Sequence, residues 1–197
     1  EVQQVRYIVN HYQQNVEGED YTLAETEGFN AETDTTVTPE VKQYDGFTSP
    51  EVKTGTVAGD GSLTIDYYYT RNVHTLTLVG VNESADQVMQ AAYGYKIPAP
   101  SRKGYLFRGW YTDSGYTVSQ PSEMPDKDLT VYAKWEAGTV GYKVEYLQEK
   151  LDGTYEVVKR ISGSGKAGET VTPEVTETEG FVSPAPQTVQ IAGDGTT

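Results

Sequence analysis

Residues 62–71, SLTIDYYYTR, alternate apolar and polar side chains with the two-residue period of a β-strand. Leu63, Ile65 and Tyr67 fall on one face, and the residues between them fall on the other. The preceding run, residues 51–58, is also strand-like, and the GDG at 59–61 supplies a turn between the two. The sequence therefore predicts a closing β-hairpin in a chain built mainly from strands.

The same turn sequence recurs near the end of the chain. AGDG at 58–61 returns at 192–195, VTPEV at 37–41 returns at 171–175, and GF at 46–47 returns at 180–181, each 134 residues later (192 minus 58). The same offset pairs Tyr12 with Tyr146, Gln14 with Gln148 and Tyr21 with Tyr155. A constant offset over this length indicates a duplicated module.

The duplication divides the chain into three stretches, which we name module A (residues 1–73), module B (74–136) and module A′ (137–197). Module A′ stops two residues after its AGDG turn, whereas module A continues with residues 62–71. Module A′ is therefore expected to lack its last strand and to expose an open sheet edge. A neighbouring molecule could add a strand at this edge, and the chain is otherwise expected to be monomeric.

Four local patterns predict further elements. NVEGED at 15–20 joins two strand-like runs and predicts a hairpin, and the Asp-Gly of LDGTY at 151–155 predicts another. Thr38 followed by Pro39 predicts a single helical turn. Residues 85–93 have apolar positions at helical spacing, but they lead directly into a strand-like run, so we favour a strand.

The composition excludes several classes of partner. The 197 residues carry a net charge of −14, and this field repels nucleic acid and anionic lipid surfaces. The chain has no cysteine, so it can form neither a disulfide nor a thiolate metal site. No apolar run is long enough for insertion into a membrane, and the first residues, EVQQVRYIVN, lack the pattern of a signal peptide. The chain is therefore expected to be a segment of a longer protein.

Module B carries the most specific motif. GYLFRGWYTD at 104–113 is followed by Pro-Asp at 125–126 and by a strand ending in YAKW at 132–135. This pattern resembles the Listeria–Bacteroides repeat, also called the internalin-type B repeat. The resemblance implies a compact β-grasp-like module used in tandem on bacterial surface proteins. It also implies an extracellular, cell-wall-associated location on a Gram-positive bacterium.

Modules A and A′ resemble the repeats of mucin-binding proteins (MucBP). The resemblance rests on Val9–Tyr12, on DGF at 45–47 and on IDYYY at 65–69, the last of which A′ lacks. Together, the two resemblances imply a mainly β fold, α+β at most, with small β-grasp-like modules in an elongated array. The name of a family does not establish a ligand for these copies.

Side chains that could carry catalysis or hold a metal are sparse. His11 and His74 have no nucleophile or acid beside them in the sequence and are expected to be structural. Glu17, Glu19 and Asp20 lack the spacing of a calcium loop and are expected to form a solvated turn. The AGDG turns lack the lysine of a phosphate-binding loop. The sequence therefore predicts no catalytic residue, no metal and no cofactor.

Two groups of side chains are candidates for a ligand surface. Tyr67, Tyr68 and Tyr69 lie in one strand, so Tyr68 faces opposite to its neighbours, and at least one of the three is expected to be exposed or to pack on module B. The second group is a small basic cluster that could attract an acidic glycan, although a solvated face is its simpler interpretation. It comprises Arg102, Lys103 and Arg108.

The aromatic residues of module B allow two interpretations. Trp110, Tyr111 and Trp135 could form a platform on which sugars stack. A module this small, however, needs its few large aromatic side chains for its core. We therefore expect them to pack in the core.

These observations leave two functions open. The first is a non-enzymatic stalk or spacer that projects an adhesive domain from the cell surface. The alternative is an adhesin whose modules bind host mucin, another glycoprotein or a glycan directly. An enzyme has the least support. An internal Lys–Asn or Lys–Asp isopeptide bond, which some bacterial stalk modules carry, also stays open, and the intact mass would reveal it.

Overall fold

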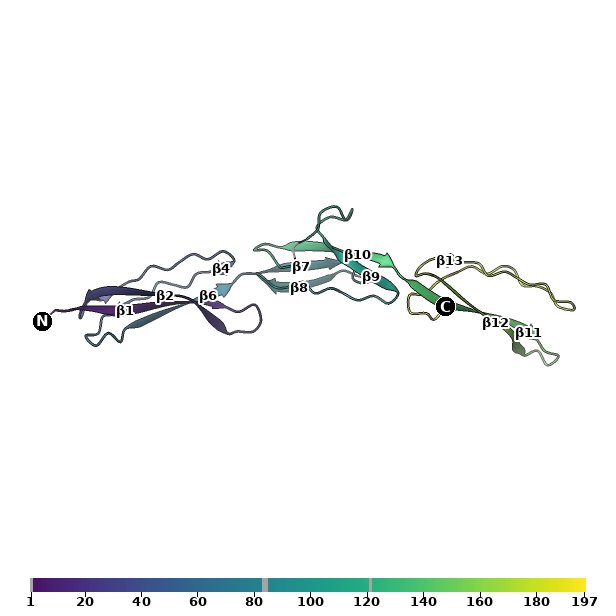
Figure 1. Ribbon diagram of the computed structural model, residues 1–197, viewed down its shortest axis with the longest axis horizontal. Helices are drawn as coiled ribbons and strands as arrows, with labels where there is room; N and C mark the ends of the chain where they lie inside the picture. The colour runs from purple at the N-terminus through teal and green to yellow at the C-terminus, as the bar shows by residue number, and fades with distance from the viewer. Residues whose placement is uncertain (1, 83–84, 121) are drawn as a thin grey trace. The chain divides into compact units, whose positions relative to one another are not determined.

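The computed structural model describes residues 2–82, 85–120 and 122–197. This part of the chain contains fourteen strands and no helix (Figure 1). The strands form several small sheets, which confirms the prediction of a mainly β fold made of small modules. The chain divides into two compact units, Glu1–Leu78 with Asp86–Pro98 and Pro121–Val131, and Val79–Ala85 with Ala99–Gln120 and Tyr132–Thr197.

Module A contains a four-stranded sheet in the order β2-β1-β6-β4. Its strands are β1 (Gln4–Gln14), β2 (Tyr21–Glu32), β4 (Phe47–Thr48) and β6 (Thr64–Arg71). β1 and β2 form the predicted antiparallel hairpin with one bulge, whereas β1 and β6 run parallel. The alternation of β6 buries Ile65, Tyr67 and Tyr69, which form the core with Tyr7 and Val9 of β1.

The predicted hairpin around the GDG turn is wrong. The run before the turn forms only the short strand β5 (Gly55–Thr56), which pairs with β3 (Thr36–Val37). β6 instead pairs with β1 over the register Ile8↔Thr64 to Gln13↔Tyr69. β5 has only 2 residues, whereas β1 has 11 and is long enough to pair along β6 and to add Tyr7 and Val9 to the same core.

The helical turn predicted at Thr38 and Pro39 is also wrong, because the residues from 38 to 44 have no regular structure. Tyrosine hydroxyls of β6 bind the backbone here in place of helical hydrogen bonds. Tyr67 Oη donates to the Pro39 carbonyl at 2.8 Å, and the Lys42 amide donates to Tyr69 Oη at 2.9 Å. The segment therefore satisfies its polar groups without a helical turn.

Module B contains a second four-stranded sheet, in the order β8-β7-β10-β9. Its strands are β7 (Val73–Val79), β8 (Gln87–Ala92), β9 (Tyr105–Tyr111) and β10 (Leu129–Ala137). β8 confirms the strand that we favoured over a helix for residues 85–93. Trp110 is buried, as expected for a core residue, and Phe107 packs edge-on against Trp110 and Trp135. The Trp135 indole donates to the Gly80 carbonyl at 2.8 Å.

Module A′ begins with an antiparallel hairpin of β11 (Thr139–Glu149) and β12 (Tyr155–Lys166), as LDGTY predicted. The strands β13 (Thr170–Val171) and β14 (Val189–Gln190) form a separate sheet. Among the described strands, β11 pairs only with β12, whereas β1 pairs with both β2 and β6. The last residue of A′ makes one hydrogen bond to β11, in which the Lys143 amide donates to the Thr197 carbonyl at 2.9 Å. In module A, the Ile8 amide of β1 donates in the same way to the Leu63 carbonyl, directly before β6.

The hairpins correct the alignment of the two repeats by one residue in their first strand. β2 and β12 keep the offset of 134 (155 minus 21), but β1 and β11 are related by 135 (139 minus 4). The difference arises because the turn from Lys150 to Thr154 is one residue shorter than the turn at 15–20. Tyr146 is therefore the counterpart of His11 and not of Tyr12, and each precedes the bulge of its hairpin.

Candidate functional site

β6 separates the three predicted tyrosines into a buried pair and one exposed residue. Tyr67 and Tyr69 are fully buried, and their hydroxyls bind the backbone of Pro39, Lys42 and Lys53. Tyr68 faces the other side of the sheet and is 42% exposed. The proposed ligand surface of three tyrosines is therefore corrected: alternation along the strand leaves only Tyr68 accessible.

Tyr68 belongs to a surface cluster that we call the tyrosine patch (Tyr12, Tyr21 and Tyr68). Tyr12 stacks on Tyr68 with ring centroids 4.9 Å apart, and Tyr21 meets Tyr68 edge-on at 5.2 Å. Lys53 Nζ lies 5.6 Å from the centre of the Tyr68 ring. Tyr12 and Tyr21 were not predicted, because the parallel pairing of β1 with β6 brings them here. Aromatic faces beside a cation are groups that can stack on a sugar.

The three predicted basic residues do not form one cluster. Arg108 Nε donates to Glu136 at 2.6 Å, and this bond lowers the pKa of that carboxyl. The Arg102 guanidinium lies 4.1 Å from the centre of the Tyr105 ring. Arg102 and Lys103 line a cleft of about 560 Å³ with the AGDG turn of A′, and Arg108 is not among the residues that line it.

The connection between β6 and β7 consists of Asn72 alone. Beside it, the ring of Tyr93 packs on Gly46 so closely that a Cβ at this glycine would overlap the ring. Arg71 binds both sides of this contact: its Nε donates to the Gln14 carbonyl at 2.7 Å, and its Nη1 donates to the Tyr93 carbonyl at 2.9 Å. We call this set of contacts the A–B junction. All of it lies within the first compact unit.

A second set of polar contacts surrounds Asn72. Its amide donates to the Gly46 carbonyl at 2.9 Å, and its side chain donates to Asp126 Oδ1 at 2.9 Å. His74 Nε2 lies 2.7 Å from the same carboxylate oxygen. Hydrogen bonds from His74 and Asn72 hold the pKa of Asp126 below its ordinary value. The carboxylate thus links the connecting residue to module B.

The connection between β10 and β11 is also one residue, Gly138. Its amide donates to the Gly104 carbonyl at 2.7 Å, and its carbonyl accepts from the Ala167 amide at 3.0 Å. The AGDG turn of A′ approaches the same place, because a Cβ on Gly104 would lie 2.5 Å from Gly193 Cα. These glycines allow two backbones to touch. The AGDG turn of A′ therefore packs its backbone directly against the backbone at Gly104.

His11 is buried among groups that resemble a catalytic relay. Its Nδ1 lies 2.8 Å from Tyr69 Oη, and its Nε2 lies 3.0 Å from Glu27 Oε2. Because the Lys42 amide donates to Tyr69 Oη, the tyrosine proton can point to Nδ1 and the Nε2 proton to Glu27. His11 and Tyr69 are buried, whereas the Glu27 side chain is 30% exposed. The relay satisfies polar groups inside the core.

Neither a metal centre nor a membrane span is found in the described part of the chain. Within residues 2–82, 85–120 and 122–197, no three His, Asp or Glu side chains are grouped so that they could hold a metal ion. The same residues include no helix with the length and apolar character needed to cross a membrane.

Small sheets, with aromatic side chains buried in modules A and B, are joined by connections of one residue and define a chain of tandem all-β repeat modules. Residues 74–134 match the family model of the Listeria-Bacteroides repeat domain, which confirms the resemblance of module B. Repeats of this family are typical of extracellular surface proteins and are generally non-catalytic. No curated protein matches the chain. The resemblance of modules A and A′ to mucin-binding repeats stays a prediction.

Proposed function

We propose that the chain is a non-catalytic spacer segment of a bacterial cell-surface protein and holds an adhesive domain away from the cell wall. A spacer needs modules with their own cores and connections that resist bending. The aromatic core of module A and the buried residues of module B meet the first requirement for these two modules. The second requirement, resistance to bending, depends on the connections between the modules.

The observation that carries the proposal is the hydrogen bonding of the two connecting residues. Asn72 binds Gly46 on one side and Asp126 on the other. Gly138 binds Gly104 on one side and Ala167 on the other. A connection of one residue has few free torsions, and bending it would break these bonds. Each junction is therefore expected to resist bending.

Distances between spin labels test this rigidity. The chain has no native cysteine, so labels can be attached at Glu32→Cys in module A and Lys127→Cys in module B, both exposed positions. We expect a narrow distribution of distances, and a broad one after insertion of a short Gly-Ser segment behind Asn72. If both proteins gave equally broad distributions, the spacer role would be refuted.

The tyrosine patch favours a second candidate, an adhesin that binds host mucin or another glycan directly. Binding of the full chain to mucin and to glycan arrays tests this function. Tyr68→Ala is expected to abolish such binding. Tyr155→Ala, which changes the counterpart of Tyr21 in module A′, is the matched control and should leave it intact. Absence of binding, or binding that Tyr68→Ala does not affect, would exclude the patch as an adhesive site.

A further inference from the structure

The A–B junction covers a surface of module A that the duplication repeats in A′. This surface consists of Val16, at the tip of the first hairpin, and of Gly46 and Phe47 in the DGF turn. Tyr93 lies on it, with its ring on Gly46 and edge-on to Phe47 at a centroid distance of 6.2 Å. A Cβ on the next residue, Gly94, would lie 3.8 Å from Val16. A Tyr-Gly turn of module B thus covers this end of module A.

Module A′ also has an aliphatic residue, a glycine and a phenylalanine in these three places. Leu151 corresponds to Val16, Gly180 to Gly46 and Phe181 to Phe47. The first correspondence follows the hairpin offset of 135 (139 minus 4), and the other two follow the offset of 134 (155 minus 21). The surface is therefore apolar and carries a glycine in both repeats.

The turn that carries the glycine has one geometry in both repeats. Gly46 has a φ of 77° and Gly180 a φ of 83°. In each turn the following phenylalanine amide donates to a carbonyl three residues earlier at 3.1 Å, Phe47 to Tyr44 and Phe181 to Thr178. Gly180 and Phe181 therefore already form the surface on which an aromatic ring can pack in A′, and we call this surface the seat.

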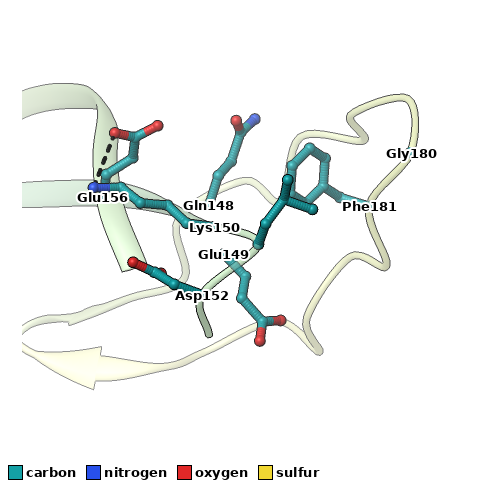
Figure 2. A pocket seen from close by; sticks show the side chains of 8 residues that line it. Gln148, Glu149, Lys150, Asp152, Glu156, Gly180 and Phe181 are labelled. Carbon is teal, nitrogen blue, oxygen red and sulfur yellow. Dashed lines mark ion pairs between the residues drawn. The ribbon is translucent and has the colours of Figure 1, made fainter. Parts of the chain in front are cut away.

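In A′ this seat is open. A Cβ built on Gly180 meets no described atom within 4 Å, whereas the ring of Tyr93 fills that place at Gly46. Phe181 is 45% exposed, and Leu151 is fully exposed. These residues line an open cavity of about 750 Å³. Figure 2 shows Phe181 and Gly180 on one side of it and Gln148, Glu149 and Asp152 of the hairpin on the other. The ion pair of Lys150 with Glu156 lies at the edge, at 3.5 Å.

We propose that the surface of Leu151, Gly180 and Phe181 is a docking site for a further module of the B type, joined to A′ as module B is joined to module A. The occupant would present a turn like Tyr93-Gly94. Its aromatic ring would pack on Gly180, which has no side chain, and its glycine would leave room for Leu151 at the tip of the hairpin. This interaction surface goes beyond the spacer role and does not depend on it.

A charged residue at the edge of the open cavity favours a B-type module as the occupant. In module A, the Gln14 side chain accepts the Arg71 amide at 3.0 Å, and its carbonyl accepts Arg71 Nε at 2.7 Å. The counterpart of Gln14 in A′ is Glu149, a lining residue of the open cavity. A carboxylate at this place attracts the arginine that precedes a B-type module more strongly than an amide does. A second copy of the chain fits less well, because its own Tyr93 already lies on Gly46.

The test uses the full chain, extended after Thr197 by a copy of residues 64–136. This extension restores the order of module A, since Thr197 corresponds to Leu63 (197 minus 134). A second extended chain carries alanine in place of the copied Tyr93, which retains the added strand and removes only the ring. Amide exchange at Phe181 is then measured in both. The intact copy is expected to slow this exchange by about tenfold relative to the alanine copy.

A matched pair of glycine variants gives a second measurement. Gly153 also has a positive φ and open space around it, so Gly153→Val has the backbone strain of Gly180→Val without blocking the seat. In the extended chain, Gly180→Val should remove the protection of the 179–182 segment, and Gly153→Val should leave it. Equal exchange at Phe181 in the two extended chains would overturn the proposal. Protection that rises with concentration in the unextended chain would assign the surface to a second copy and would also overturn it.

Discussion

The ring of Tyr93 lies against the backbone of Gly46, in the position that a Cβ of residue 46 would occupy. Gly46 also has a φ of 77°, in the left-handed region that side chains rarely adopt. Two separate constraints, one conformational and one steric, therefore require glycine at this position. They can be separated by comparison with a glycine that has only the first constraint.

Gly46→Ala is expected to destabilise module A by about 2–5 kcal/mol, because backbone strain of about 1–2 kcal/mol adds to an overlap that costs about 1–3 kcal/mol. Gly18 has a φ of 81° with open space around it, so Gly18→Ala is the control and should show the strain alone. Urea denaturation followed by tyrosine fluorescence measures both variants. Equal losses would mean that the Tyr93 contact contributes no stability.

Arg71 is expected to be irreplaceable by lysine. Its Nε and Nη1 bind two different carbonyls, those of Gln14 and Tyr93, and its plane lies over Phe47 at 4.7 Å. A lysine ammonium cannot reproduce this fork. Arg71→Lys should therefore cost about 1–3 kcal/mol and speed amide exchange at Tyr93. Arg108→Lys, at an exposed ion pair with Glu136, is the control and should cost less than about 1 kcal/mol. Similar losses in both variants would contradict a bridging role for Arg71.

The A–B junction is expected to loosen in acid. Hydrogen bonds from His74 and Asn72 lower the pKa of Asp126 in the folded chain, so the unfolded chain takes up this proton at a higher pH than the folded chain does. The stability that Asp126 contributes is then complete above about pH 4, the ordinary value, and is lost as the pH falls through the lowered pKa. Amide exchange at Asn72 measured from pH 6 downward tests this.

The control for the acid effect is Asp152→Asn. Asp152 also has a lowered pKa, caused by hydrogen bonds from Thr154, but it lies in a turn of A′. Asp126→Asn should remove the acid response at Asn72, and Asp152→Asn should leave it unchanged. An acid response at Asn72 that persists in Asp126→Asn would place the titrating group elsewhere.

The sequence was sufficient to predict the β1–β2 and β11–β12 hairpins and the alternation of β6, because turn residues and a two-residue period are local signals. The partner of β6 was not predictable in the same way. Its parallel pairing with β1 depends on which strand is long enough to pair along β6 and has apolar side chains for the same core. The absence of a helical turn at Pro39 depends on the Tyr67 hydroxyl, which comes from a distant part of the sequence.

The junction contacts were harder to predict than the strands. GF at 46–47 and 180–181 was visible as a repeat, but nothing in the sequence shows that Tyr93 packs on the first copy. The pairing of Tyr12 with Tyr146 was misleading, because both positions hold a tyrosine at the offset of 134. The shorter turn of A′ shifts β11 by one residue, so the structural counterpart of Tyr146 is His11. Since successive side chains of a strand face opposite ways, that shift exchanges an inward residue for an outward one.

A short extension is expected to stabilise module A′. In module A, β6 lies beside β1 and buries Ile65, Tyr67 and Tyr69, whereas Val144 and Tyr146 of β11 stay only half-buried. A copy of residues 64–71 added after Thr197 should pair with β11 and raise the melting temperature of A′, by roughly 4–8 °C for each 1 kcal/mol gained. The control is an extension of the same length with serine in place of the isoleucine and the two inward tyrosines. Calorimetry of the full chain compares the two, and equal melting temperatures would show that β11 does not accept a strand of the β6 pattern.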